Sequence, residues 1–376
     1  MKILLTGASS GGHFYPIIAV AQELNRQIRE HKLFKVELFY MSTNPYNPGL
    51  LFENGITFKK NPAGKLRRYF SIFNFTDVFK TGFGVIKALW VVFTIFPDVV
   101  FGKGGYGSFP ALWAARFLGI PVVIHESDST PGKVNAWAGK FAKRVAVSYP
   151  ETASFFPQEK VALTGNPVRQ EIKEPQSNNA HEFFNLDKNI PTILILGGSQ
   201  GSEIINNAVM DALGTLIPRY QIIHQTGNAN FEAVKTTANV VLLDNPRKDN
   251  YKVFGYLDTL QLRLAAGAAD IVISRAGSTI FEIAAWGKPS IVIPISNSND
   301  DHQRKNAFSY ARSGAAFVIE EKNVSTNILT SEISRIFDKQ GQKEKMSQAA
   351  KAFFKPDAAE KIAEEILAIA LAHENK

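Results

Sequence analysis

Residues 270–282 read DIVISRAGSTIFE, and the rest of the chain is organised around them. The apolar run Ile271–Ile273 predicts a buried strand, Ser274–Gly277 a tight turn, and Ser278–Thr279 the start of a helix. At a helix start the backbone N–H groups lack partners and the dipole is positive, so a phosphate or pyrophosphate can bind there. Glu282, one turn inside, is placed to accept hydrogen bonds from paired ribose hydroxyls. The alternative is a capping box, in which Glu282 bonds only the backbone of the cap.

A second polar helix start follows in the sequence. Ser290–Pro294 predicts the next strand, and the polar run from Asp300 to Asn306, which contains His302 and Gln303, opens another helix. Parallel strands end at one edge of a sheet, so two polar helix starts at adjacent strand ends predict a single binding crevice.

Length and composition indicate an ordinary globular protein of about two domains. The chain has 376 residues, of which 45% are hydrophobic and 20% charged. It has no cysteine, which excludes disulfides, thiolate metal sites and a cysteine nucleophile. The first residues show no secretory signal, so we expect a cytoplasmic protein. The most apolar window, Ala88–Phe101, is interrupted by Pro97–Asp98, and we expect it to be too short to span a membrane.

The formal net charge of +8 predicts an anionic partner. Nucleic acid is not expected, because the positive charge is not gathered into a recognition motif. An anionic membrane surface is favoured by the stretch 65–75, KLRRYFSIFNF, in which basic residues alternate with aromatic ones. The alternative is a core helix with a solvated basic end. The predicted membrane patch consists of Lys65, Arg67, Arg68, Phe70, Phe73 and Phe75.

The N-terminal segment predicts a strand, a glycine turn and a helix. Met1–Thr6 is the strand, Gly7–His13 the turn, and Ile17–Ile28 has helical periodicity. Glycines let the backbone approach a ligand, although the spacing of a dinucleotide fingerprint is not present. His13 is a candidate base, because an imidazole in the first helical turn can stay neutral.

Further strands alternate with helical stretches through the first half, which predicts a parallel, doubly wound sheet. Two polar segments, 103–110 and 125–128, lie at the carboxyl ends of strands, where open α/β sheets bind ligands. Glu126 is a second candidate base, because a carboxylate facing glycine turns suits that role. The alternative is a structural His125–Glu126 pair. The expected strands are Lys35–Met41, Ile56–Lys59, Asp98–Phe101, Val122–His125 and Arg144–Val147.

The second half repeats the pattern after a polar segment that we expect to be an irregular linker. The strand Thr192–Leu196 runs into the turn Gly197–Gly201, which places Ser199 at a helix start. Strands are also expected at Tyr220–His224 and Lys252–Gly255. The predicted divisions are an N-terminal domain at 1–168, the linker at 169–190, a C-terminal domain at 191–355, and a helix at 356–376 that returns to the first domain. The cleft between two such halves is the expected active site.

Taken together, these motifs resemble the MurG-type family of peptidoglycan glycosyltransferases over nearly the whole chain. Each motif is weak by itself, but their order along the chain is specific. The motifs are Ser10–His13, Gly104–Ser108, His125–Glu126, Gly165–Arg169, Gly198–Gly201, Ser274–Gly277 with Glu282, and His302–Gln303 with Asn306–Ala307.

The resemblance implies a GT-B fold, an α/β architecture of two doubly wound, Rossmann-like domains facing a cleft. It implies a lipid acceptor on the first domain and a UDP-sugar mostly on the second, with the Leu257 backbone holding uracil, Glu282 the ribose and Gln303 the sugar. The implied donor-site residues are Ser10, Gly11, Gly12, Arg169, Ser199, Leu257, Gly277, Ser278, Thr279, Glu282 and Gln303. Those implied for the sugar and acceptor are Gly104, Gly105, Tyr106, Ser108, His125, Asp128, Asn135 and His302.

The activity so implied is inverting transfer of N-acetylglucosamine from UDP-N-acetylglucosamine to the 4-hydroxyl of undecaprenyl-linked muramyl-pentapeptide. His13 or Glu126 would take the hydroxyl proton. We expect no cofactor and no metal, because the sequence has no clear Asp-x-Asp site. The enzyme would lie peripherally on the cytoplasmic face of the bacterial membrane. Three departures stand out: the first turn reads Ala8–Ser9–Ser10 where many members have Gly-Gly-Thr, Asp128 replaces the Asn of some members, and the turn from Gly277 to Glu282 is one residue shorter than in many.

Two rival functions remain open at this stage. A UDP-N-acetylglucosamine 2-epimerase on the same fold would need no lipid-facing patch and would release UDP without an acceptor. A non-catalytic, membrane-bound subunit that presents a lipid substrate would need no intact motifs in the second domain.

Overall fold

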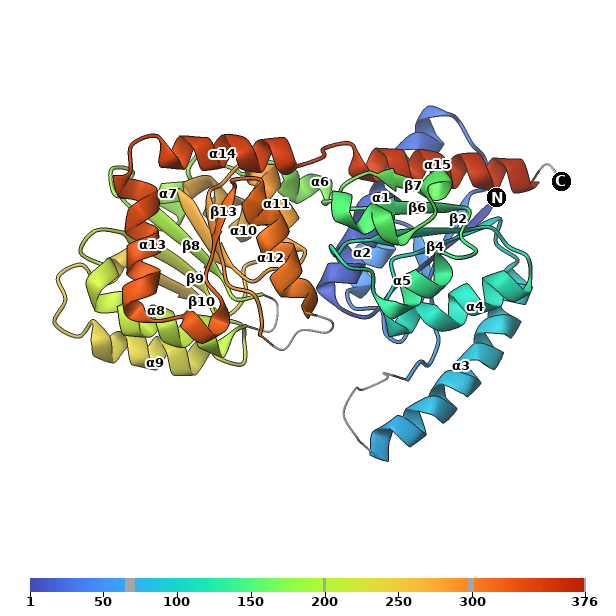
Figure 1. Cartoon of the computed structure of the whole chain (residues 1–376), viewed down its shortest axis with the longest axis horizontal. Helices are drawn as coiled ribbons and strands as arrows, with labels where there is room; N and C mark the ends of the chain where they lie inside the picture. The colour runs from blue at the N-terminus through green and yellow to red at the C-terminus, as the bar shows by residue number, and fades with distance from the viewer. Residues whose placement is uncertain (65–71, 199–200, 297–300, 375–376) are drawn as a thin grey trace. The chain divides into compact units, whose positions relative to one another are not determined.

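The computed structural model describes residues 1–64, 72–198, 201–296 and 301–374. The chain forms two compact units, one made of Met1–Arg169 with Lys355–Lys376 and the other of Gln170–Phe354. Each unit is a parallel sheet with helices on both faces, which is the GT-B architecture of two Rossmann-like domains (Figure 1).

The first sheet has the strand order β3-β2-β1-β4-β5-β6-β7, with every neighbouring pair parallel. Its central strands are buried on both faces, which explains their continuous apolar sequences. Ile3 and Leu5 point into one core and Leu4 into the other. The strands are β1 (Lys2–Thr6), β2 (Glu37–Ser42), β3 (Ile56–Lys60), β4 (Val99–Gly102), β5 (Val122–Glu126), β6 (Arg144–Val147) and β7 (Val161–Leu163).

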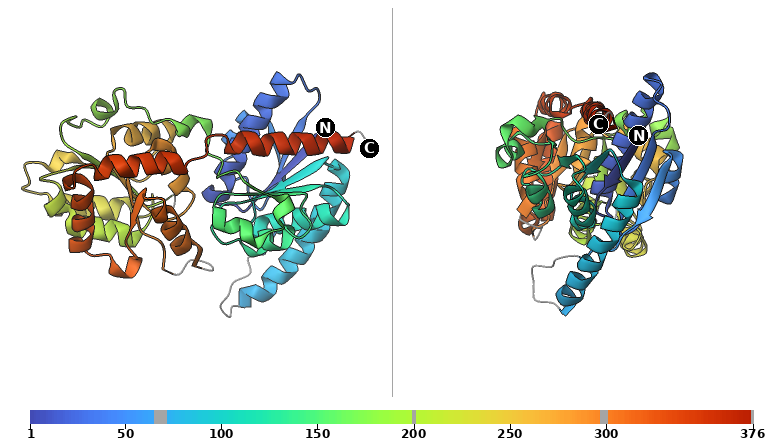
Figure 2. Two further views of the ribbon diagram at one scale, coloured as in Figure 1. Left: turned by 45° about the horizontal axis from the view of Figure 1, so that its top comes forward. Right: turned by 90° about the vertical axis from the view of Figure 1, so that its right-hand side faces the viewer.

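Helices from both ends of the chain cover one face of this sheet. The last helix, which begins after Pro356, packs beside the first (Figure 2). Its residues Ile362 and Ile366 enter the core that contains Ile17 and Leu24. The helices of the unit are α1 (Gly11–Glu30), α2 (Pro48–Glu53), α3 (Ile72–Ile95), α4 (Phe109–Phe117), α5 (Lys133–Ala138) and α15 (Ala358–Glu374).

Helix α3 differs from the sequence expectation. The apolar window was expected to start at Ala88 and to be too short to span a membrane, but the segment Thr76–Ile95 is long and apolar enough by length and composition. The expectation concerned the window up to Phe101, which Pro97–Asp98 interrupts; the helix ends before that interruption, at Ile95, and gains its length toward the N-terminus. The end of α3 packs on α4 through Ala88 and Val92, while its start extends away from the sheet (Figures 1 and 2).

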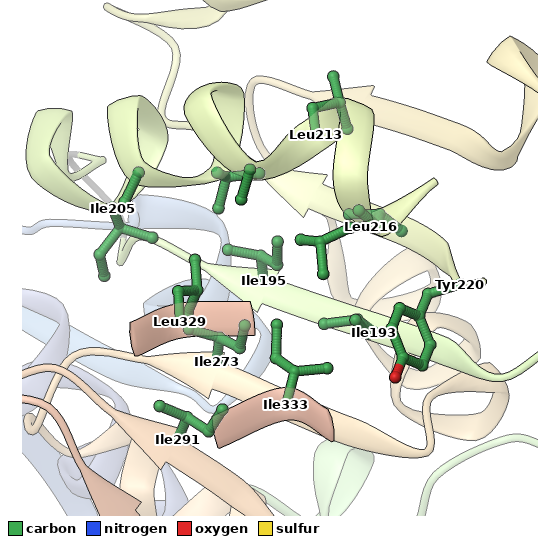
Figure 3. Close-up of a cluster of buried hydrophobic side chains, with 14 of the residues drawn as sticks. Ile193, Ile195, Ile205, Leu213, Leu216, Tyr220, Ile273, Ile291, Leu329 and Ile333 are labelled. Carbon is green, nitrogen blue, oxygen red and sulfur yellow. The ribbon is translucent and has the colours of Figure 1, made fainter. Parts of the chain in front are cut away.

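The second sheet has the order β10-β9-β8-β11-β12-β13. Its two faces alternate in the same way. Ile193 and Ile195 lie in one core (Figure 3), and Leu194 and Leu196 lie in the other. The strands are β8 (Thr192–Leu196), β9 (Gln221–Gln225), β10 (Tyr251–Phe254), β11 (Ile271–Ser274), β12 (Ser290–Val292) and β13 (Ala316–Val318). The helices are α6 (Gln170–Lys173), α7 (Ala180–Phe183), α8 (Glu203–Leu216), α9 (Phe231–Val241), α10 (Thr259–Ala268), α11 (Thr279–Trp286), α12 (His302–Arg312), α13 (Thr326–Asp338) and α14 (Gln342–Phe353).

The segment expected to be an irregular linker belongs to the second unit. It contains α6 and α7, and Ile172 and Phe184 are buried in the core that includes Trp286. The indole N–H of Trp286 donates to the carbonyl of Ile172 at 2.7 Å. The expectation of an irregular linker was wrong, because it was based on the polar sequence around these few apolar residues.

Candidate functional site

Both sheets have a topological switch point, where chain connections leave two neighbouring strands in opposite directions. In the first unit it lies between β1 and β4, and in the second between β8 and β11. Such points open a crevice at the carboxyl ends of the strands, where α/β proteins bind ligands. The turns after β1, β4 and β11 carry most of the predicted site residues, and the order of strands brings them to these two places.

In the first unit, the glycine turn after β4 packs against the turn after β1. The Ala8 N–H donates to the Gly104 carbonyl at 3.1 Å. Gly104 and Gly105 have φ values of +86° and +78°, which glycine adopts without strain. A Cβ at Gly104 would also lie 2.7 Å from Asn135 Nδ2, and one at Gly105 would lie 3.1 Å from His13 Nε2. The glycines therefore allow His13 to approach the second turn closely.

His13 lies in the first turn of α1, and its side chain is partly exposed. Its Nδ1 is 2.8 Å from the Ser10 hydroxyl, and Ser10 is the N-cap of the helix. Gly11 and Gly12 are the first two helical residues. Arg169 is the last residue of the first segment of this unit. Its guanidinium lies 4.0 Å from the ring centroid of Tyr15, which belongs to α1. The start of α1 thus gathers Ser10, Gly11, Gly12, His13 and, through Tyr15, Arg169.

Glu126, at the end of β5, is 4% exposed and firmly held. Its Oε1 accepts from the Asp128 N–H at 3.0 Å, and its Oε2 accepts from the Gly132 N–H at 3.0 Å and Asn135 Nδ2 at 2.9 Å. Burial and the neighbouring Asp128 carboxylate raise the pKa of Glu126. The hydrogen bonds from the Asp128 N–H and Asn135, together with the Lys103 charge, lower it, but the pKa remains raised. A carboxylate has about four acceptor positions, and three N–H groups use most of them.

Around Glu126 lies a cluster of buried polar atoms without a hydrogen-bond partner in the described part of the chain. It consists of Lys103 Nζ, His125 Nδ1 and Asn135 Oδ1. The other ring nitrogen of His125 lies 3.0 Å from the Gly165 carbonyl. Burial, and next the Lys103 ammonium, lower the pKa of His125 well below its usual value, so the ring is neutral.

Lys103 was not among the predicted site residues. It is 1% exposed, and burial lowers its pKa to about 8 although Glu126 and Asp128 oppose the shift. Its position directly after a buried strand and before two glycines was the only signal in the sequence. The Lys103 ammonium interacts electrostatically with the Glu126 and Asp128 carboxylates and partly balances their negative charge.

The glycine turn after β4 continues into a short 3-10 helix at Tyr106–Ser108. The Ser108 hydroxyl donates to the Gly105 carbonyl at 2.8 Å and closes the turn. Tyr106 is partly exposed on it. No group of three or more His, Asp or Glu side chains could share a metal ion among the described residues.

In the second unit, the turn after β11 leads directly into α11. Ser278 is the N-cap but its side chain makes no capping hydrogen bond, so the capping-box alternative is not seen. Among the described residues, and apart from its two chain neighbours, none has an atom within 4 Å of the position that a Cβ would take at Gly277. Ser278, Thr279 and Glu282 are all partly exposed. The start of α11 therefore offers backbone N–H groups beside open space, with a carboxylate one turn inside.

Helix α12 is joined to this turn. Asn306 Nδ2 donates to the Ala276 carbonyl at 3.3 Å, and Gln303 Oε1 accepts from the Ile295 N–H at 3.2 Å. His302 is the first helical residue. The two polar helix starts of the sequence analysis thus lie at neighbouring strand ends.

Leu257 follows β10 and is buried, and its N–H donates to Gln225 Oε1 at 3.1 Å. Ser199 lies outside the described residues, as do Lys65, Arg67, Arg68 and Phe70 of the predicted membrane patch. Of Phe73 and Phe75, only the backbone, at the start of α3, is described.

Two family models match the chain. The glycosyltransferase family 28 N-terminal domain matches residues 3–147, and the glycosyltransferase family 28 C-terminal domain matches residues 192–362. A Clostridium novyi protein named UDP-N-acetylglucosamine--N-acetylmuramyl-(pentapeptide) pyrophosphoryl-undecaprenol N-acetylglucosamine transferase is 37% identical over 340 residues, which cover 89% of this chain and 90% of the relative. A protein of the same name from Oenococcus oeni is 35% identical over 365 residues, which cover 96% and 95%.

Solved structures show the same architecture. Acinetobacter baumannii MurG has a TM-score of 0.73 and 26% identity, with 98% of this chain and 99% of that chain covered. The UDP-GlcNAc 2-epimerase from Neisseria meningitidis, bound to UDP-GlcNAc, has a TM-score of 0.69 and 16% identity, with 98% and 100% covered. At that identity the likeness to the epimerase concerns the fold alone.

Proposed function

The chain belongs to the family of UDP-N-acetylglucosamine--N-acetylmuramyl-(pentapeptide) pyrophosphoryl-undecaprenol N-acetylglucosamine transferases, and we propose that it performs the reaction of that name. N-acetylglucosamine would pass from UDP to the 4-hydroxyl of the lipid-linked muramyl-pentapeptide, with inversion at the anomeric carbon. The observation that carries the proposal is the start of α11, where N–H groups beside open space stand one turn before Glu282.

The second unit would bind the nucleotide part of the donor. The backbone N–H groups of Gly277, Ser278 and Thr279 would bind the diphosphate, assisted by the dipole of α11. Glu282 would accept from the ribose hydroxyls. The N–H of Leu257 is used by Gln225, so its carbonyl is the group that would accept from the uracil N–H. Gln303 and His302, at the start of α12, would face the sugar.

The reaction would be a single displacement. The acceptor oxygen forms a bond to the anomeric carbon while the bond from that carbon to the β-phosphate oxygen breaks, and UDP leaves with the electron pair. The developing charge on UDP would be stabilised by helix N-termini and by Arg169. The proton of the acceptor hydroxyl passes to a base of the first unit, beside the turn at Gly104–Gly105. This scheme assigns no step to a metal or cofactor.

His13 is the base that we propose. It is partly exposed and lies beside the glycine turn, whereas Glu126 is buried and its oxygens accept from three N–H groups. Glu126 would instead hold the segment 126–135 in shape, and with it Asp128 and Asn135. The neutral His125 and the buried Lys103 would support that segment.

A membrane surface is the partner that we propose for α3. Five large apolar side chains recur along it at helical spacing and are 62–69% exposed: Phe79, Phe83, Ile86, Trp90 and Phe93. An apolar stripe of this kind on a helix that extends from the unit suits insertion at the boundary of headgroups and acyl chains. It follows directly in sequence on the basic and aromatic stretch 65–75, whose cations would meet anionic headgroups. Peripheral attachment would bring the first unit to its lipid-linked substrate.

The base can be identified by comparing two alanine variants. His13→Ala should lower turnover about 10²–10⁴-fold, which is the usual contribution of a positioned base, with an unchanged melting temperature. Glu126→Ala should lower the melting temperature as well, because three N–H donors, one buried and two partly buried, lose their acceptor. Near-normal turnover of His13→Ala, together with lost turnover of Glu126→Gln at unchanged stability, would assign the base to Glu126.

Donor affinity should depend on Glu282. A hydrogen bond to a charged group contributes about 1.5–3 kcal/mol, so Glu282→Ala should raise the Michaelis constant for UDP-N-acetylglucosamine more than tenfold. The melting temperature should change little, because Ser278 and Glu282 form no capping box. Steady-state kinetics and thermal unfolding measure the two effects. A collapse of the melting temperature with donor affinity retained would show that Glu282 is structural.

The membrane proposal is tested by sedimentation with anionic vesicles. Burying an aromatic side chain stabilises binding by roughly 1.5–3 kcal/mol, so the double variant Phe83→Ser, Trp90→Ser should bind at least tenfold more weakly, even in high salt. The matched control is Leu243→Ser in the second unit, where the side chain is 73% exposed, and it should sediment like the unmodified protein. If the double variant also sediments unchanged, α3 is not the membrane contact.

A further inference from the structure

Arg275 lies within the turn after β11, yet its guanidinium is bound to protein groups. One terminal nitrogen donates to Glu321 Oε1 at 2.6 Å and the other to the Ile293 carbonyl at 3.1 Å. The side chains of Arg275 and Glu321 are 13% and 11% exposed, so solvent screens this ion pair only weakly. The cation nearest in sequence to the proposed diphosphate site is therefore part of an internal ion pair.

Glu321 joins three segments at the carboxyl edge of the second sheet. It is the first residue of a short 3-10 helix at Glu321–Asn323, after β13. One oxygen accepts from Arg275, in the turn after β11, and the other accepts from the Ser296 N–H at 2.8 Å, in the segment after β12. Burial opposes ionisation of Glu321, but the hydrogen bonds from Ser296 and Arg275 outweigh it and lower the pKa.

The segment held by Glu321 also contacts Gln303. Ile295, which precedes Ser296, donates its N–H to Gln303 Oε1 at 3.2 Å. A chain of contacts therefore runs from Arg275 through Glu321, Ser296 and Ile295 to Gln303. This bond directs the amide oxygen of Gln303 toward Ile295, so the amide nitrogen points away from Ile295.

We propose that Glu321 and Arg275 are positioning residues that hold the segment 295–296 and thereby orient Gln303 toward the sugar of the donor. The proposal rests on the proposed function, since it takes the second unit as the site of UDP-N-acetylglucosamine. It concerns the sugar and not the nucleotide, because the ribose and uracil are assigned to Glu282 and Leu257, which lie outside this chain of contacts.

The test compares binding of UDP with binding of UDP-N-acetylglucosamine by calorimetry on the full chain. Glu321→Gln keeps the shape and an acceptor for Ser296 but removes the charge that holds Arg275. It should weaken UDP-N-acetylglucosamine about tenfold and UDP less than about twofold, a loss confined to the sugar. Arg275→Met should give the same split, and Arg275→Lys, which keeps the positive charge, should recover part of the loss.

The matched control is Asp338→Asn. Asp338 forms an ion pair with Arg219 at 2.7 Å in the same unit, and Arg219 precedes β9, at the amino edge of the sheet. Its loss removes the same charge and should leave both affinities unchanged.

Two results would overturn the proposal. Equal losses for UDP and UDP-N-acetylglucosamine in Arg275→Met would mean that Arg275 contacts the diphosphate directly or supports the whole turn. Unchanged affinities in Glu321→Gln would mean that the ion pair does not position the sugar contact. If the unmodified protein binds neither ligand, the proposed function fails and this proposal fails with it. If the unmodified protein binds both ligands but Arg275→Met weakens both equally, only this proposal is contradicted.

Discussion

The pairing of parallel strands is the constraint on which the rest of the structure depends. Parallel strands all end at one edge of their sheet, and the reversal of strand order beside β1 and beside β8 leaves that edge open at one point in each unit. In the first unit, the glycine turns after β1 and β4 meet at this point although they lie far apart in the sequence. In the second unit, the turn Ser274–Gly277 before α11 lies at the corresponding point. Burial of both sheet faces fixes the register, because alternate residues of β1 and β8 enter different cores.

The two units use their carboxylates differently. In the first, Glu126 is buried with Lys103 and His125, and its hydrogen bonds to backbone and amide groups hold a loop in place. In the second, Glu282 is partly exposed on the first turn of α11, where a ligand can reach it. Burial thus separates a carboxylate that shapes a site from one that can bind a substrate, and neither role follows from the residue type alone.

The fold and most of the candidate site could be predicted from local patterns in the sequence. The apolar runs of β1, β8 and β11 and the small-residue turns after them predicted a doubly wound architecture, and the resemblance of the ordered motifs to one family predicted its GT-B form, as the relatives confirm. What the sequence could not show depends on distant partners. The role of Lys103 can be recognised only from its interaction with Glu126 and Asp128, and that of Glu321 only from its contacts with Arg275 and Ser296. The outward stripe of α3 was missed because charged residues mask its period in the sequence, and only packing on α4 shows which face is exposed.

The central claim is that the chain transfers N-acetylglucosamine to a lipid-linked muramyl acceptor. The most direct measurement is the release of UDP from UDP-N-acetylglucosamine with and without that acceptor in vesicles, together with identification of the disaccharide product. We expect that UDP release requires the acceptor and matches the disaccharide formed, one for one. Steady UDP release without acceptor, accompanied by the 2-epimer of the sugar, would exclude the transferase function and favour an epimerase.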